Sequence, residues 1–210
     1  MTKRAWTTTS ALRRGVLAVA AALTLALTLS SDGGRAIAAS PTPSPEALFE
    51  SFLKAIDVVP ASRADLEQAF PDARARLLAA AGEDARDEWT RTRAIAFLGF
   101  YPDAGVRAAL VGLAEHRHPE VRKRAVYQLA RSFGQPGDAA LLALVDRATG
   151  DADSRVAEAA VRGLRWVDAA GAKASLERIA ASDRAPKAMR SLARFTLERR
   201  AKRLAGGGAR

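Results

Sequence analysis

The sequence predicts an all-α, right-handed α-solenoid of helical hairpins closed by atypical helical caps. The first observation is composition, because alanine, leucine, arginine and glutamate dominate and these side chains lose little rotamer freedom in a helix. The second is the lack of any segment with the strict alternation of a half-buried strand. The third is a repeated helical register in the central part of the chain. With 210 residues the chain is long enough to bury a core.

Four segments share one pattern, and their first residues are 31, 35 and 33 positions apart. Each places a mostly apolar residue, an alanine and a leucine at i, i+4 and i+8, which is one face of a helix. The small alanine allows a neighbouring helix to approach closely. The positions are Thr90, Ala94 and Leu98; Val121, Ala125 and Leu129; Val156, Ala160 and Leu164; and Met189, Ala193 and Leu197. This periodicity predicts a repeat architecture.

Shorter apolar segments at 107–115, 139–148 and 174–181 separate these helices, so the repeating unit is helix, turn, helix. Residues suited to helix ends stand between the segments. Asp103, Asp138 and Asp153 are predicted N-caps, and Gly134 is a predicted C-terminal stop. Pro119 and Pro186 are placed in first turns, where a missing N–H group costs nothing.

The second helix of this unit resembles that of HEAT repeats, particularly the short kind in the phycobilisome-lyase-like group. The motif runs Asp/His-Pro-x-Val-Arg and continues to alanine and leucine. It is matched by 118–122 (His-Pro-Glu-Val-Arg) with Ala125 and Leu129, and next by 153–156 with Ala160 and Leu164. The resemblance covers about residues 86–200. It implies that the second helices line a concave surface, and it implies no lyase activity, because repeats specify a fold and not a reaction.

Residues 1–38 have the three parts of a secretory signal peptide. Basic residues open it, an uncharged run follows from Gly15 to Leu29, and 36–38 (Ala-Ile-Ala) place small residues before a cleavage point between Ala38 and Ala39. We therefore expect an exported protein, periplasmic or extracellular. The alternative is a membrane anchor formed by an uncleaved signal. Arg13-Arg14 resembles a twin-arginine signal, so both the general and the twin-arginine export routes fit.

Beyond the signal, the prediction divides the chain into four parts. Residues 39–45 form a proline-rich spacer, because alternate prolines remove hydrogen-bond donors. Residues 46–86 are N-terminal capping helices, predicted at 46–56, at 64–70 behind a Ser62 cap, and at 72–81. Residues 87–204 are the repeat array, and 205–210 are a disordered tail.

The formal charge of +10 is concentrated at one end. Removal of residues 1–38 leaves +6, and residues 184–210 alone carry +8, so the remainder is close to neutral. This distribution does not suggest a basic groove for nucleic acid. It does offer a second binding mode, to an anionic membrane or envelope polymer, through a basic C-terminal helix that holds Arg190, Arg194, Arg199, Arg200, Lys202 and Arg203.

No pattern in the sequence points to chemistry, and we expect no enzyme activity, cofactor or metal. There is no cysteine, and the two histidines, His116 and His118, are better suited to capping before Pro119 than to binding a metal. Asp151 and Asp153 have the opening spacing of a calcium loop but lack its glycine and distal glutamate. A solvated turn is the favoured interpretation. The acidic residues of 83–88 are expected to open the helix that contains Trp89.

Positions two residues beyond the core register point roughly away from it and hold aromatics and arginines. We expect a monomer that binds a protein or peptide through Phe100, Tyr127, Arg131, Arg162, Trp166 and Phe195, since such residues are enriched at binding hot spots. The competing interpretation is that these aromatics pack between adjacent repeats, because helices of a solenoid have two buried flanks.

Overall fold

The computed structural model describes residues 43–206, and within that range it contains ten α-helices and no strand. The predicted all-α class is confirmed. The chain divides into two compact units, one ending at Ala73 and the other beginning at Arg74. The predicted signal peptide, most of the spacer and the last four residues lie outside the described range. Among the described helices, none combines the length and apolar character needed to cross a bilayer.

The described part of the first unit holds α2 (Pro45–Lys54) and α3 (Arg63–Ala69). Each begins at a serine whose hydroxyl accepts a backbone hydrogen bond three residues later, at 3.1 Å for Ser44 and 3.2 Å for Ser62. The predicted spacer is one residue too long, because Pro45 occupies the first turn of α2, where its missing N–H is tolerated. Three rings from 49, 52 and 70 pack with centroids 5.1–6.0 Å apart.

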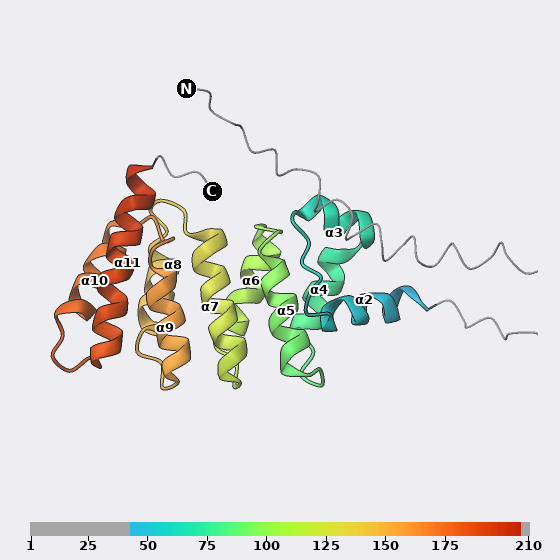
Figure 1. The fold of residues 1–210 in the computed structure, drawn as a ribbon, viewed down its shortest axis with the longest axis horizontal. Helices are drawn as coiled ribbons and strands as arrows, with labels where there is room; N and C mark the ends of the chain where they lie inside the picture. Colours follow the sequence, from blue (N-terminus) through green and yellow to red (C-terminus); the bar gives the residue numbers. More distant parts are fainter. Residues whose placement is uncertain (1–42, 207–210) are drawn as a thin grey trace, which may run out of the picture. The chain divides into compact units, whose positions relative to one another are not determined.

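The second unit is a series of helical hairpins (Figure 1). Its helices are α4 (Ala73–Gly82), α5 (Glu88–Leu98), α6 (Ala104–Leu113), α7 (Pro119–Phe133), α8 (Ala139–Ala148), α9 (Ser154–Gly163), α10 (Ala170–Ala181) and α11 (Lys187–Ala205). The pairs α6–α7, α8–α9 and α10–α11 form hairpins, and the second helices α5, α7, α9 and α11 pack on one another in that order. Since α4 falls almost entirely in this unit, the division lies before the boundary predicted at residue 86.

The predicted core register is confirmed. In α5, α7 and α9, every residue at i, i+4 and i+8 is 1% exposed or less, and Ala193 in α11 is fully buried. Met189 and Leu197 are only half-buried, because α11 is the last helix of the described array and packs mainly on α9 and α10. The repeated alanine and leucine positions that indicate a helix in the sequence therefore also lie at the contact between consecutive second helices.

Helix ends follow the predicted caps with two exceptions. The carboxylates of Asp103, Asp138 and Asp153 accept backbone hydrogen bonds at 2.9–3.0 Å as N-caps of α6, α8 and α9. Pro186 is itself the N-cap of α11 rather than a first-turn residue. His118 is the N-cap of α7 but makes no side-chain cap hydrogen bond, so its predicted capping role is wrong.

Gly134 is the predicted stop of α7, but not because it adopts a left-handed conformation. Its φ is −67°, which any residue tolerates. A Cβ at this position would lie 2.3 Å from the carbonyl oxygen of Trp166, and the Gly134 carbonyl accepts a 3.1 Å hydrogen bond from the N–H of Asp168. The glycine is required because the backbone beyond α9 passes directly against the end of α7.

Candidate functional site

The solvent-facing side of the second helices carries a surface of aromatic and arginine side chains, which we call the second-helix face. We define it by Phe100 after α5; Arg124, Tyr127 and Arg131 of α7; Glu158, Arg162, Arg165 and Trp166 of α9 and the turn after it; and Phe195 and Arg199 of α11. It contains all six residues predicted for partner binding.

A contact between two repeats lies at the centre of the second-helix face. The Arg165 Nη2 donates a hydrogen bond of 3.3 Å to the Tyr127 hydroxyl, and the Arg165 guanidinium lies 4.6 Å from the centre of the Trp166 ring. All three side chains are half-buried. A guanidinium that rests on an indole face is stabilised by the ring quadrupole and keeps a fixed orientation. Tyr127 and Trp166 therefore form one platform that joins α7 to the end of α9.

The other predicted residues are not joined to this platform by a shared partner. Phe100 stacks on Phe97 with centroids 6.3 Å apart, within its own repeat. Phe195 is 53% exposed, and Arg199 lies over its ring at 5.5 Å. Both aromatics therefore have local partners, and only Phe195 presents most of its ring to solvent.

The two predicted arginines differ in their partners. Arg162 forms an exposed ion pair of 2.9 Å with Glu158 one helical turn earlier. Arg131 is exposed and makes no hydrogen bond or ion pair within residues 43–206. A surface pair of the first kind contributes little to stability, whereas Arg131 presents an unpaired charge.

Sequence reasoning missed Arg165 and Arg124 as members of this surface. Arg165 lies beyond the last turn of α9, so helical periodicity gave no direction for its side chain. Arg124 is different, because 124, 127 and 131 are spaced i, i+3 and i+7 and share one helix face. That spacing was available in the sequence and could have identified it.

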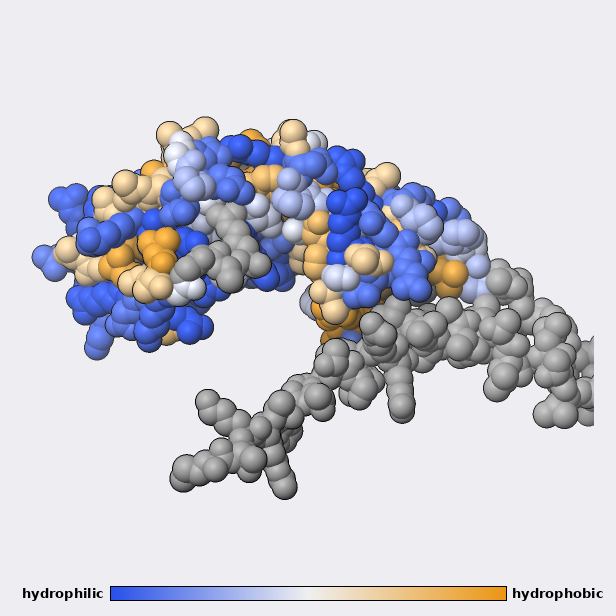
Figure 2. All heavy atoms as spheres, turned by 90° about the horizontal axis from the view of Figure 1, so that it is seen from above, coloured by the Kyte–Doolittle hydropathy of each residue, from blue (hydrophilic) through white to orange (hydrophobic). Residues whose placement is uncertain are grey.

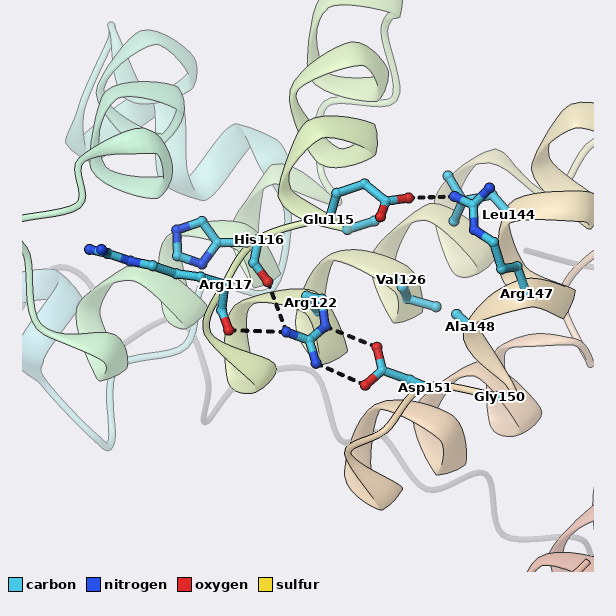
Figure 3. A pocket seen from close by; sticks show the side chains of 11 residues that line it. Glu115, His116, Arg117, Arg122, Val126, Leu144, Arg147, Ala148, Gly150 and Asp151 are labelled. Atoms are coloured by element: carbon cyan, nitrogen blue, oxygen red, sulfur yellow. Dashed lines mark hydrogen bonds and ion pairs between the residues drawn. The ribbon is translucent and has the colours of Figure 1, made fainter.

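The turns inside the hairpins form a separate polar edge, which Figure 3 shows around Arg122. Arg122 Nε and Nη2 donate to the two carboxylate oxygens of Asp151 at 2.9 and 2.8 Å, 29 residues away. Its Nη1 also donates to the carbonyl oxygens of His116 and Arg117 at 2.9 and 3.1 Å. One guanidinium thus holds the turn of its own hairpin and the turn of the next.

These residues line a polar pocket of ≈ 410 Å³ between the two turns. Its charged groups already serve one another, because Arg122 holds Asp151 and the exposed Arg147 pairs with Glu115 (Figure 3). The pocket is accordingly a seam between repeats that is closed by ion pairs.

The equivalent position in the preceding repeat is Arg91, which is 2% exposed. Its guanidinium donates to the Ala81 carbonyl oxygen at 3.3 Å and lies 3.0 Å from the Asp84 carboxylate. His116 Nε2 is 2.9 Å from the same carboxylate, and its Nδ1 accepts the His118 N–H at 3.0 Å. Because Nδ1 is an acceptor, Nε2 carries the proton and donates a hydrogen bond to the Asp84 carboxylate.

Asp84 therefore does not open α5 as predicted; it joins two turns, and hydrogen bonding from His116, with Arg91 nearby, lowers the pKa of this carboxylate. Asp87 is the N-cap that accepts the Thr90 N–H at 2.9 Å. In the repeat of α9, Ala157 stands at the position equivalent to Arg91 and Arg122, so this repeat has no arginine there to join its turn to the next.

Asp151 and Asp153, the candidate calcium-loop residues, are both held by arginines. Asp153 caps α9 and accepts from Arg155 at 2.8 Å, and this hydrogen bond is the main reason that its pKa falls to about 2. The Arg122 fork lowers the pKa of Asp151 in the same way. Asp153 therefore caps a helix and Asp151 bridges two repeats, so this turn is held by arginines rather than being simply solvated.

The depressed pKa of Asp151 predicts an acid-sensitive contribution to stability. A carboxylate whose pKa is lower in the folded state stabilises the fold above its unfolded pKa of about 4, and this contribution is lost as the pH falls through the folded pKa. When the pH is lowered, urea unfolding should therefore show a larger loss of stability for the wild type than for Asp151→Asn. Asp183→Asn, at an exposed aspartate with no ion pair within residues 43–206, should follow the wild type. Parallel pH profiles for all three proteins would contradict the prediction.

Two of the six residues predicted to form a basic surface on α11 instead donate hydrogen bonds to backbone carbonyl oxygens of the protein. Arg200 is 6% exposed and donates to the carbonyl oxygens of Leu164, Val167 and Ala169. Arg203 Nε donates to the Arg165 carbonyl oxygen at 3.0 Å. Both supply donors to carbonyl groups at the carboxyl end of α9 and in the connection to α10, a region where such groups need donors and the helix dipole favours positive charge.

The remaining basic residues of that set have partial partners or none. Arg190 and Arg194 donate to the carbonyl oxygens of Ala185 and Ala180 at 2.9 and 3.4 Å, and Arg199 and Lys202 are exposed. Hydrophobic atoms also reach the surface at this end of the second unit (Figure 2), where Leu204 is 46% exposed. The predicted anionic-surface site is therefore reduced from six cations to four.

Stacked helical hairpins whose second helices share one buried register define an α-solenoid. Residues 108–198 match the family model described as HEAT repeats, and this part of the chain belongs to the HEAT-repeat family. HEAT repeats generally mediate protein–protein interactions as scaffolds and are typically not enzymes. No curated protein matches the chain.

Proposed function

We propose that this protein is an exported helical-repeat scaffold that binds a protein or peptide partner on the concave face formed by its second helices. The observation that carries the proposal is the Tyr127–Arg165–Trp166 contact, which joins neighbouring repeats on the solvent side of α7 and α9. Half-buried aromatics fixed by arginine lose little entropy on binding, and this composition is typical of binding hot spots.

Packing between repeats and partner binding are compatible roles for this platform. The contact between Tyr127 and Arg165 crosses from one repeat to the next, as the packing interpretation requires. The Trp166 Nε1 is enclosed and has no hydrogen-bond partner within residues 43–206, so the indole is placed by its contact with Arg165. Because both rings remain half-exposed, the same arrangement offers a rigid apolar surface to a partner.

Replacing both Tyr127 and Trp166 by alanine should weaken capture of the partner from an envelope extract by about 100-fold or more, since hot-spot residues each contribute about 2 kcal/mol. Circular dichroism should show unchanged helix content. Trp89→Ala is the matched control, because this ring is 52% exposed on α5 outside the second-helix face. Unfolding of the double variant would show that the rings are core residues, and full capture by a folded double variant would place the binding surface elsewhere.

Export is the second part of the proposal and rests on the three-part pattern of residues 1–38. Fractionation of cells with intact-mass measurement should find a mature chain that begins near Ala39 in the periplasm or medium. A full-length chain in the membrane fraction would instead identify a tethered scaffold. A full-length chain in the cytoplasm would overturn the signal peptide and restore nucleic acid as a partner class.

A further inference from the structure

The α7 stripe of the second-helix face carries positive charge that no described carboxylate neutralises. Arg124, Tyr127 and Arg131 are spaced i, i+3 and i+7 and so lie along one side of α7. Neither arginine makes an ion pair within residues 43–206, and the Nε of Arg124 is enclosed without a hydrogen-bond partner there. The nearby Lys123 and Arg162, in contrast, are paired with Glu120 and Glu158.

A third guanidinium reaches the same place from the neighbouring repeat. Arg165 donates to the Tyr127 hydroxyl at 3.3 Å and lies on the Trp166 ring, and both partners are neutral. Its charge is therefore oriented but not compensated by any carboxylate in the described part of the chain. The stripe on α7 and the end of α9 together present three uncompensated arginines around one aromatic platform.

We infer that the partner is an acidic protein segment that lies across α7 and the end of α9. Its carboxylates contact Arg124, Arg131 and Arg165, and an apolar side chain packs on Tyr127 and Trp166. This inference rests on the proposed function and names the chemistry of its partner. Guanidinium forks match carboxylates in a bidentate geometry, and an anion relieves the mutual repulsion of the three cations. The aromatic platform favours a protein over a purely ionic polymer, because it needs an apolar group to cover it.

The test is selection of binders from a random peptide library displayed on phage, with the full chain as bait at low salt. The selected peptides are expected to be enriched in aspartate and glutamate around an apolar residue. Their binding should require Tyr127 and Trp166. It should also weaken as the ionic strength rises from about 0.01 M to about 0.15 M, because the Debye length then shortens from roughly 30 Å to roughly 8 Å.

Single substitutions then test the direction of the effect with a synthetic acidic peptide from the selection. Arg131→Gln should weaken binding about tenfold through loss of one charge-assisted hydrogen bond. Glu158→Gln should strengthen binding, because it releases Arg162 from its ion pair. Arg178→Gln is the matched control, since it removes the same charge from α10, where Arg178 pairs with Asp146 at 2.7 Å, and it should leave binding unchanged.

The outcomes separate this inference from the proposed function. Neutral or basic peptides that bind in a Tyr127- and Trp166-dependent manner would overturn the acidic partner and leave the proposed function standing. Binders that do not depend on the two aromatics would overturn both. An equal loss with Arg131→Gln and Arg178→Gln would show that binding follows net charge alone, and the inferred site would be wrong.

Discussion

Arg200→Ala is expected to lower the free energy of unfolding by about 2–4 kcal/mol, a large effect for a residue in a basic C-terminal helix. The side chain is 6% exposed and donates to the carbonyl oxygens of Leu164 at the end of α9 and of Val167 and Ala169 in the connection to α10, so its removal leaves buried acceptors unpaired and a cavity between two repeats. Burial lowers the pKa of the Arg200 guanidinium. Urea unfolding followed by circular dichroism measures the loss.

The neighbouring Arg199 provides the control, because it is exposed and its guanidinium lies over the Phe195 ring. Arg199→Ala should change stability by less than about 1 kcal/mol. Hydrogen exchange should show that Arg200→Ala opens α10 and α11 first, since repeats contact only their neighbours and terminal ones open independently. Equal effects of the two substitutions would contradict the assignment of Arg200 as a buried cap.

The position of Arg200 also changes how the anionic-surface alternative can be tested. Deletion of residues 198–210 removes the surface cations together with Arg200 and Arg203, which complete the end of α9. Loss of binding by that deletion would therefore not distinguish a missing charge from a disturbed α9. Substitution of Arg199 and Lys202, both exposed, separates the two effects.

The fold was predictable because each helix repeats one short packing rule. An alanine and a leucine four residues apart identify the buried stripe, and an aspartate before each of α6, α8 and α9 identifies where that helix begins. Both signals are local, and the structure agrees with them to within a few residues. The burial of Arg200 was not predicted, because Arg200 lies with Ala193 and Thr196 on a buried stripe at i, i+3 and i+7 that the alanine and leucine register does not include.

The pairings of the candidate site were less predictable, because they join residues that are distant in the sequence. Arg122 and Asp151 are 29 residues apart, and Tyr127 and Arg165 are 38 apart. Helical periodicity indicates that arginines and aromatics share a face. Which of them pair depends on how adjacent repeats are offset along their axes and on the turns, which have no periodic pattern. His116 is the clearest case, because its contact with Asp84 depends on how two turns meet.

Leu129→Ala is the second large effect, with an expected loss of about 2–5 kcal/mol. Leu129 is fully buried in α7, which packs on α5, α6 and α9, so the deleted atoms leave a cavity that several neighbours line. Leu197→Ala makes the same chemical change at the same position of the repeat in α11, where the leucine is only half-buried. It should cost less than half as much, because part of the leucine is already in water and the site can relax. Chemical denaturation of both variants measures the difference, and equal losses would show that register alone, rather than the number of packed neighbours, determines the contribution of each leucine.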